Sequence, residues 1–358
     1  MLSADAPLVL LLHGGLDNLS GKTGLAMLRY RRGPIVAVID PDHAGADLEA
    51  LTGIARAVPV VADMEAALAH GPAVAVVGLA PSGGRLPEAM RADVAAGLRA
   101  GLCLASGLHS RLADDPDFAA IPLRPGQWIW DLRQEPRDLE VATAAAAALP
   151  CRRLLALGSD MAVGKMSACL ELQAAAQRRG LDARFVGTGQ AGILIAGSGV
   201  ALDAVRVDYA AGAVQAAVLQ AAAGAGPQAL LLVEGQGSLA HPGSTATLPL
   251  LRGSQPTDLL LVHRARQSHV RTRPEAVPVA IPPLPELIAA CEALAALGRP
   301  DGRRPRVRAI ALNTALLDSA AAAHEAAALA EATGLPVFDP VRLGGDALLE
   351  AVLAAGVD

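Results

Sequence analysis

The amino-acid sequence predicts an α/β protein of two domains, each built around a parallel sheet. Its 358 residues are enough for two cores at about 100–200 residues per domain. Short continuous apolar runs alternate with amphipathic stretches along the chain, as in strands that helices cover on both faces. Hydrophobic residues make up 53% of the chain and the mean hydropathy is +0.39, which excludes a disordered protein.

The first 135 residues contain one set of alternating elements. We interpret residues 1–135 as a Rossmann-like domain on the substrate side, and residues 136–150, charged at first and then rich in alanine, as a linking helix. Within the first domain, strands are expected at 8–12, 35–39, 59–61, 74–77, 101–105 and 128–131, and helices at 21–30, 46–57, 63–70 and 86–100.

A second alternating set fills residues 151–358. Its first strand leads into a glycine-rich turn, a lysine and a helix, which is typical of a P-loop NTPase-like doubly wound domain. Strands are expected at 154–157, 183–186, 229–233, 259–262, 307–312 and 336–338, and helices at 164–180, 202–223, 284–297, 319–333 and 346–355.

The composition argues against several classes of function. A net charge of −5 and an aromatic content of 2% argue against nucleic-acid binding. No segment has the apolar length of a membrane span, and no basic segment precedes the first apolar run, so we expect neither a membrane anchor nor a signal peptide. We expect a cytoplasmic protein that acts on a small molecule, with the homo-oligomeric state left open. No metal or disulfide site is expected, because the four cysteines are far apart: Cys103, Cys151, Cys169 and Cys291.

Lysine is rare in this chain, and its two positions share one pattern. Of the 30 basic residues, 28 are arginine, and the two lysines are Lys22 and Lys165. Each lysine ends a G-x5-G-K motif, beginning at Gly15 and at Gly158. Both sites therefore favour a compact ammonium group on a flexible stem.

The second motif follows a strand and opens a helix, so it predicts a phosphate-binding loop. Its spacer has five residues instead of four, and Met166 stands where Ser or Thr would hold Mg²⁺, with Ser167 one position later. The alternative is a structural turn with a surface lysine. The expected cofactor-binding residues are Gly158, Ser159, Met161, Ala162, Val163, Gly164, Lys165, Met166 and Ser167.

Catalytic candidates lie near the ends of the predicted strands of the second domain. Glu234 follows a buried strand, where an acid can organise a metal or serve as a general base, although it could also only cap a turn. Asp160 lies inside the loop, and His241 precedes a proline, a position that is often structural. Asn313 ends a strand where related folds contact a purine ring.

Polar and flexible residues also follow strands of the first domain, and together they predict a second anion pocket for a small acidic substrate. Ligands of open parallel sheets bind beyond the carboxyl ends of the strands. Ordinary loop chemistry accounts for any one of these residues alone. The expected substrate-binding residues are Lys22, Thr23, Asp40, Gly83, Gly84, Arg85 and His109.

The combination of motifs resembles known proteins. The segment Gly158–Lys165 with Glu234–Ser238 resembles the P-loop of dethiobiotin synthetase and its relatives. The whole chain is similar to a bacterial domain-of-unknown-function family that includes D-glutamate N-acetyltransferase, in which a Rossmann-like domain precedes a P-loop domain. Further matching stretches are Gly21-Lys-Thr23, Ser106-Gly-Leu-His109, Gly187-Thr-Gly-Gln190 and Asp339-Pro-Val-Arg342.

This resemblance implies N-acetylation of a D-amino acid such as D-glutamate, with acetyl-CoA as the donor. The phospho-ADP part of CoA would lie at the P-loop, and Glu234 or His241 would take a proton from the substrate ammonium group. Lys22 and Arg85 would bind its acidic groups. Two alternatives remain: an ATP- and Mg²⁺-dependent ligase or kinase like dethiobiotin synthetase, and a nucleotide-sensing module without enzymatic activity.

Overall fold

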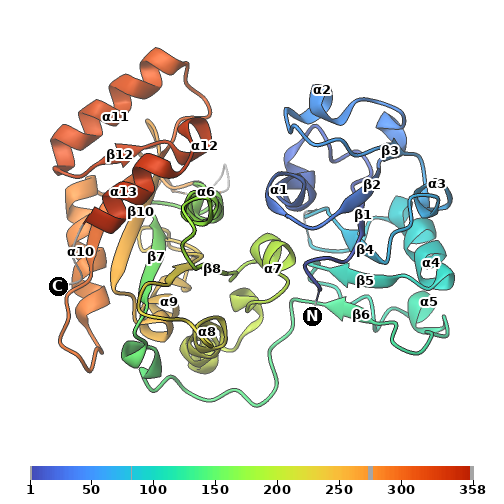
Figure 1. The fold of residues 1–358 in the computed structure, drawn as a ribbon, viewed down its shortest axis with the longest axis horizontal. Coiled ribbons are helices and arrows are strands. Elements are labelled where there is room, and N and C mark those ends of the chain that lie inside the picture. Colours follow the sequence, from blue (N-terminus) through green and yellow to red (C-terminus); the bar gives the residue numbers. More distant parts are fainter. Residues whose placement is uncertain (1, 82, 273–276, 355–358) are drawn as a thin grey trace. The chain divides into compact units, whose positions relative to one another are not determined.

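The computed structural model describes residues 2–81, 83–272 and 277–354, and the chain forms two compact units (Figure 1). The first unit runs to Glu135 and also includes Gln190–Ala204, while the second contains Pro136–Gly189 and the chain from Val205 onward. In the described residues each unit contains a six-stranded sheet whose neighbouring strands are parallel. The predicted α/β class with two parallel-sheet domains is confirmed.

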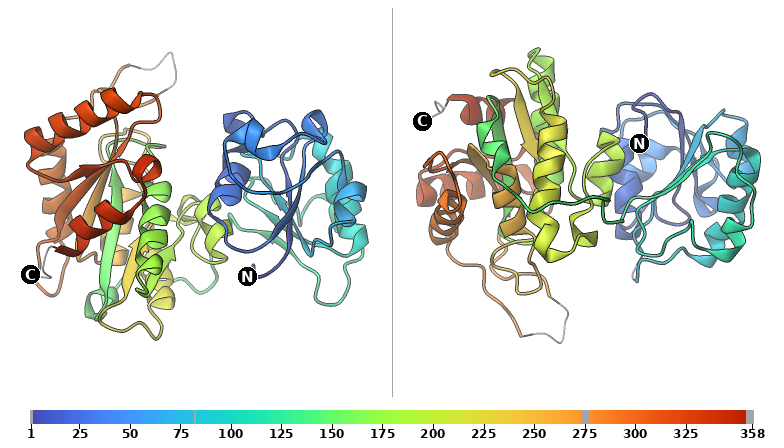
Figure 2. Two further views of the ribbon diagram at one scale, coloured as in Figure 1. Left: turned by 45° about the horizontal axis from the view of Figure 1, so that its top comes forward. Right: turned by 90° about the horizontal axis from the view of Figure 1, so that it is seen from below.

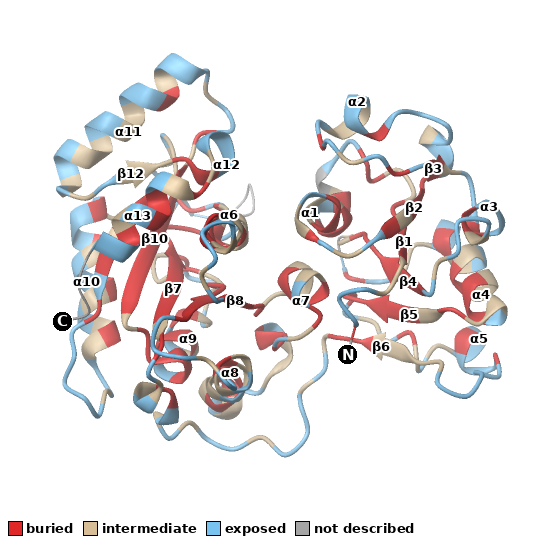
Figure 3. Cartoon of the chain, in the orientation of Figure 1, coloured by how far each residue is buried: buried red, intermediate tan, exposed pale blue. Residues whose placement is uncertain are grey.

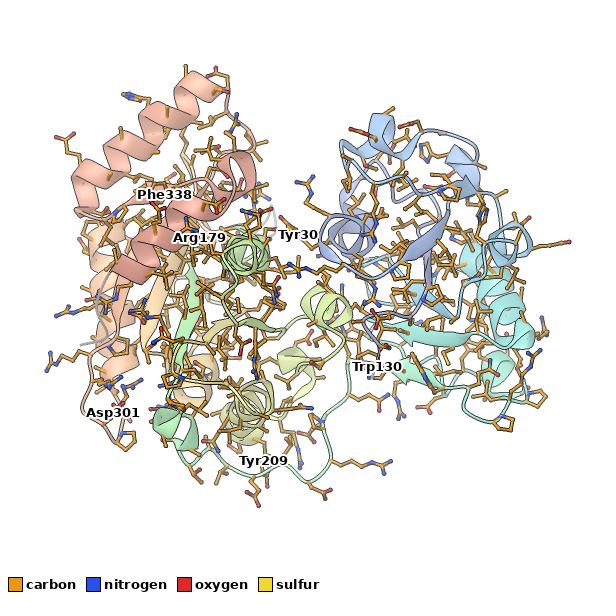
Figure 4. The ribbon with its side chains drawn as sticks, in the orientation of Figure 1. Tyr30, Trp130, Arg179, Tyr209, Asp301 and Phe338 are labelled. Atoms are coloured by element: carbon orange, nitrogen blue, oxygen red, sulfur yellow. The ribbon has the colours of Figure 1, made fainter. Side chains whose placement is uncertain are left out.

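The first sheet has the strand order β3-β2-β1-β4-β5-β6, which is the Rossmann order. The order reverses between β1 and β4, so a ligand crevice is expected at the carboxyl ends of these two strands. The strands are largely buried (Figure 3). They are β1 (Leu8–Leu11), β2 (Ile35–Ile39), β3 (Val60–Val61), β4 (Val74–Val77), β5 (Cys103–Ser106) and β6 (Ile129–Asp131), the last of which carries Trp130, labelled in Figure 4.

Two groups of helices pack in this unit. The helices α3, α4 and α5 pack side by side, and α7 packs against α1. Asp63 begins α3 by accepting a hydrogen bond from the amide of Ala66, as an N-cap does. The helices are α1 (Lys22–Tyr30), α2 (Leu48–Thr52), α3 (Met64–Leu68), α4 (Arg91–Ala100), α5 (Pro116–Ala119) and α7 (Gln190–Ala196).

The second sheet has the order β12-β11-β10-β7-β9-β8, so β7, the strand before the phosphate loop, lies between β10 and β9. Its apolar residues are buried from both sides, which explains their continuous hydrophobic runs. The strands are β7 (Arg152–Gly158), β8 (Ala183–Val186), β9 (Leu230–Val233), β10 (Asp258–Arg264), β11 (Arg306–Asn313) and β12 (Val337–Phe338).

The helices of the second unit also form two groups, which can be followed in the two views of Figure 2. One group contains α6, α12 and α13, because both later helices pack on α6; the other contains α8, α9, α10 and α11, which pack in succession. The helices are α6 (Lys165–Arg178), α8 (Val207–Ala221), α9 (Thr247–Ser254), α10 (Leu284–Ala296), α11 (Ser319–Thr333), α12 (Pro340–Leu343) and α13 (Asp346–Ala354).

The linking helix predicted for residues 136–150 is wrong. Only Ala145–Ala148 forms a short 3-10 helix there. The side-chain oxygen of Gln215, on α8, accepts hydrogen bonds from the amides of Thr143 and Ala145, and Ala144 has a φ of +60°. The amides of Thr143 and Ala145 are therefore satisfied by another helix, and those of Ala147 and Leu149 by the short 3-10 helix itself.

Two further expectations need correction. The helix expected over residues 46–57 is limited to α2, because Gly53 takes the left-handed conformation that ends helices. Residues 190–204, which the sequence predicts to lie in the second domain, belong to the first unit. No helix in the described part of the chain is long and apolar enough to cross a membrane.

Candidate functional site

The glycine-rich loop predicted to bind phosphate joins β7 to α6. The strand ends at Gly158 and the helix begins at Lys165, in the predicted order. Gly164 has a φ of +114°, which only glycine adopts readily, and it precedes the helix without a side-chain cap. The first amides of α6 are thus left for a ligand, and the helix dipole adds about half a positive charge there.

Side chains from elsewhere in the second unit bind three carbonyl oxygens of the loop. In contrast, the amides of residues 162–164 have no hydrogen-bond partner among the residues that the structure describes. Unpaired neighbouring amides of this kind can cradle an anion. The side-chain donors are Arg264 to Ala162 O at 2.7 Å, Asn313 to Val163 O at 3.0 Å and Ser238 to Ser159 O at 3.0 Å.

The side chain of Lys165, the first residue of α6, extends back into this loop. Its Nζ donates a hydrogen bond to the main-chain oxygen of Asp160, 2.8 Å away, and only 6% of the residue is exposed. A Cβ on Gly158 would lie 2.6 Å from Nζ and one on Gly235 2.9 Å from Cδ, so both glycines leave room for the lysine. Burial lowers the pKa of Lys165 to about 8, while the charges of Asp160 and Glu234 oppose this shift.

The carboxylate of Asp160 fixes the shape of the loop. Oδ1 accepts a hydrogen bond from the amide of Met161 at 2.7 Å. Oδ2 accepts from the Gln267 side chain at 2.6 Å and from the amide of Arg271 at 2.8 Å. Asp160 thus ties the loop to the segment after β10, and the catalytic role suggested for it stays a prediction.

A buried histidine that is not among the predicted site residues contacts the start of the loop. His263, on β10, lies 2.8 Å from Ser159 Oγ through its Nδ1. Burial lowers its pKa to about 4, so the ring is neutral at pH 7. The only signal in the sequence was its position near the end of a strand, which many structural residues share.

Glu234 follows β9 and is almost completely buried. Its Oε2 accepts hydrogen bonds from the amides of Thr188 and Gly189 at 2.8 and 3.1 Å. Its Oε1 lies 3.3 Å from the side-chain nitrogen of Gln236. Burial raises the pKa of Glu234 to about 7, although the two amides and Lys165 lower it. A carboxyl group with this pKa can exchange a proton near neutral pH.

His241 is placed differently from a typical general base. Its Nδ1 accepts a hydrogen bond from the amide of Gly243 at 3.0 Å, and its Nε2 lies 3.0 Å from the main-chain oxygen of Arg271. Since a carbonyl can only accept, Nε2 carries the proton and both ring nitrogens are engaged. These contacts favour the structural alternative for His241, and its catalytic role stays a prediction.

A pocket of about 390 Å³ lies beside the loop. Gly164 and Ser167 form one side of it, and residues 339–342 form another. Asn313 lines the pocket, but its amide nitrogen donates to the loop and its oxygen accepts from Ala315 at 3.1 Å. The pocket has room for a ring next to the phosphate loop, while both polar atoms of Asn313 are already used. Met166 is partly buried, and Met161 and Ala162 are exposed.

The first G-x5-G-K motif forms a different structure. A Cβ on Gly21 would lie 1.9 Å from Gly15 O, so the loop is closed on itself. Lys22 is exposed at the start of α1 and makes no hydrogen bond or ion pair with any described residue. Thr23, in contrast, is buried and accepts a hydrogen bond from Gln190 Nε2 at 2.9 Å. The two motifs share a spacing but place their lysines in opposite environments.

The other substrate-binding candidates of the first unit are divided between buried and exposed positions. Asp40 is buried and accepts from the amide of Gly14 at 2.8 Å, and its other oxygen lies 3.1 Å from His43 Nδ1. Gly83 and Arg85 are exposed.

Gly84 and His109 lie together, because a Cβ on Gly84 would lie 2.2 Å from the His109 ring. His109 also contacts Arg133, a residue that the sequence analysis missed because nothing in its local sequence distinguishes it from the other arginines. Gln190 and Arg133 thus link Thr23 to His109, against which Gly84 packs. In contrast, Lys22 and Arg85 lie on the surface.

Comparison with protein families gives matches to both units. Residues 140–349 match a family described as "Domain of unknown function (DUF1611_C) P-loop domain". Residues 41–135 match "Domain of unknown function (DUF1611_N) Rossmann-like domain". The resemblance to a family with these two domains is confirmed.

Similar proteins include two named D-glutamate N-acetyltransferase. The one from Tritonibacter scottomollicae is 33% identical over 351 residues, covering 98% of this chain and 99% of the relative. The one from a Pseudoalteromonas species is 32% identical over 275 residues, covering 76% and 79%. Among solved structures, a DUF1611 family protein from Anabaena variabilis shares 52% identity with a TM-score of 0.89, covering 98% of this chain and 100% of that one.

Proposed function

The chain belongs to the DUF1611 family, and we propose that it is an N-acetyltransferase. The proposed reaction moves an acetyl group from acetyl-CoA to the amino group of a D-amino acid that resembles D-glutamate. One observation carries this proposal. A buried lysine and a buried carboxyl group with a pKa of about 7 lie at the same glycine-rich loop, in a chain similar to two proteins named D-glutamate N-acetyltransferase.

The phosphate loop fits the polyanionic part of CoA. The unpaired amides of residues 162–164 and the ammonium group of Lys165 provide donors and a positive charge for its phosphates. The pocket of about 390 Å³ that Gly164 and Ser167 line would hold the attached ring. Acetyl-CoA supplies the activated acetyl group when bound.

Glu234 is the residue that we assign to proton transfer. An amino acid carries an ammonium group at neutral pH, and this group must lose a proton before its nitrogen can act as a nucleophile. The pKa of about 7 allows the Glu234 carboxylate to take that proton near neutral pH. The two amides that bind Oε2 keep the carboxylate oriented, while Oε1 has only the long contact with Gln236 among the described residues.

The test follows free thiol while the purified protein is incubated with acetyl-CoA and a panel of D- and L-amino acids. We expect thiol release with D-glutamate and none in a Lys165→Ala control. No release with any amino acid would reject the proposal. Magnesium-dependent ADP formation from ATP with a small carboxylic acid would support the ligase or kinase instead, and nucleotide binding without turnover would support the sensor.

A further inference from the structure

Arg133, just beyond β6, occupies a prepared position in the first unit. Its side chain is only 16% exposed. Nε donates to the main-chain oxygen of Gly107 at 2.7 Å, and Nε and Nη2 lie 3.1 and 2.8 Å from the side-chain oxygen of Gln190. These neutral acceptors hold one side of the guanidinium group, but they do not neutralise its charge.

The groups around Arg133 are themselves held in place. The side-chain nitrogen of Gln190 donates a hydrogen bond to Thr23 Oγ1 at 2.9 Å, which fixes the amide whose oxygen binds Arg133. A Cβ on Gly107 would lie 2.8 Å from the Gln190 oxygen, so the glycine leaves room for this close approach. Gly84 has a φ of +63° and leaves room for the His109 ring. Gly84, Gly107 and the buried Thr23 thus all help to position the groups that contact the guanidinium of Arg133.

Among the residues that the structure describes, the remaining nitrogen, Nη1, contacts two groups. One is His109, whose Nε2 is 3.0 Å away, and the other is the carboxylate of Asp203. Asp203 is half exposed, whereas Arg133 is mostly buried. The Asp203 carboxylate therefore reaches Nη1 of Arg133 from the solvent side, where a carboxylate from solution can compete with it for this nitrogen. Guanidinium groups match carboxylates in geometry and charge.

The cluster lies at the edge of the sheet where a ligand is expected. Thr23 follows β1, Gly84 follows β4, His109 follows β5 and Arg133 follows β6. Parallel strands bring their carboxyl ends to one edge, and the Rossmann order places the crevice between β1 and β4. Thr23, Gly84 and His109, which the sequence predicts to line a second anion pocket, therefore follow strands that end at this edge, and Arg133 adds a cation near them.

We propose that Arg133, oriented by Gln190 and flanked by His109, binds a carboxylate of the amino-acid substrate and that Asp203 competes with this carboxylate for Nη1. The proposal rests on the proposed function for the identity of the substrate, an acidic amino acid. It differs from an ordinary structural ion pair in one respect: removing the two partners should change ligand affinity in opposite directions.

The experiment is a calorimetric titration of the full-length protein with D-glutamate, with and without CoA. We expect Arg133→Gln to weaken binding at least tenfold, and Asp203→Asn to strengthen it several-fold because the competing charge is removed. The pair Arg91–Asp115, 2.8 Å apart in the same unit, provides matched controls. Arg91→Gln and Asp115→Asn should leave the affinity unchanged, and thermal unfolding monitors the fold of every variant.

Three results would overturn the inference: wild-type affinity in Arg133→Gln, weaker binding in Asp203→Asn, or no D-glutamate binding by the wild-type protein under either condition. The failure of the proposed function is a separate result. Arg133-dependent binding without thiol release rejects acetyl transfer and retains the carboxylate site. Thiol release with an unchanged KM for D-glutamate in Arg133→Gln rejects the site and retains the function.

Discussion

The ammonium group of Lys165 donates a hydrogen bond to the carbonyl oxygen of Asp160 within the same loop, 2.8 Å away. The loop therefore holds its own cation in a buried position, where the pKa falls to about 8 because charge is disfavoured away from water. A bound phosphate would add a negative charge to those of Asp160 and Glu234, which already oppose the fall in this pKa. Phosphate binding and lysine protonation should thus support each other.

Replacing this lysine should abolish binding of the cofactor. We expect Lys165→Ala to weaken CoA binding at least a hundredfold in calorimetry, because a charge-assisted contact in a buried site is lost. The fold should persist, since among the described residues this side chain hydrogen-bonds only within its own loop.

The control for Lys165 is the other lysine. Lys22→Ala should leave CoA affinity unchanged because that residue is exposed in the first unit. If Lys22 binds the acidic substrate as predicted, its variant should raise the KM for the amino acid. A CoA affinity that stays normal in Lys165→Ala would show that the loop is only architectural.

The rate should depend on the protonation of Glu234. A general base acts in its ionised form, so kcat/KM should fall as the pH drops below about 7, the pKa to which burial raises this carboxyl group. Glu234→Gln keeps the shape of the side chain but cannot take a proton, and we expect a loss of roughly 10²–10⁴-fold with the pH dependence removed. A Gln variant with the same pH profile would assign the base elsewhere, and His241→Gln is then the variant to measure.

The same carboxyl group should also affect stability. Its pKa is higher in the folded protein than its ordinary value of 4.5, so its contribution is present below pH 4.5 and is lost as the pH rises through 7. Between pH 5 and pH 8 the wild-type protein should lose about 2 kcal/mol of unfolding free energy relative to Glu234→Gln. Denaturant unfolding of both proteins at the two pH values measures this difference, and a constant difference would contradict the shift.

The phosphate loop and most strands could be predicted because their signals are local. Strand, glycine loop, lysine and helix follow one another in the chain, and continuous apolar runs such as Ile35–Ile39 mark strands that are buried on both sides. Lys22 shows the limit of this reasoning. It has the same spacing as Lys165, but burial depends on the packing around each loop.

The contacts that complete each site come from distant segments. Gln267 and Arg271 meet Asp160 from more than 100 residues away, and Gln190 reaches Thr23 and Arg133 because α7 packs in the first unit. No periodicity or spacing within the sequence predicts contacts between segments so far apart. They arise only when the strands are ordered in the sheet and the long connections are placed.

His263 should make the second unit sensitive to acid. Its ring contacts the phosphate loop, with Nδ1 2.8 Å from Ser159 Oγ. Burial lowers the pKa of His263 from 6.5 to about 4. Because the folded pKa is lower than the ordinary value, this contribution to stability is complete above pH 6.5 and is lost as the pH falls through 4. His263→Asn has no group that titrates there.

The free energy of unfolding of the wild-type protein should therefore fall by about 3 kcal/mol relative to His263→Asn between pH 7 and pH 4. Chemical denaturation across this range measures the difference, and His70→Asn, which removes an exposed histidine of the first unit, is the matched control. Since charging the ring would bury a charge beside the loop and destabilise its surroundings, affinity for CoA should decline over the same acidic range. Affinity and stability that are both independent of His263 would mean that the loop does not depend on this support.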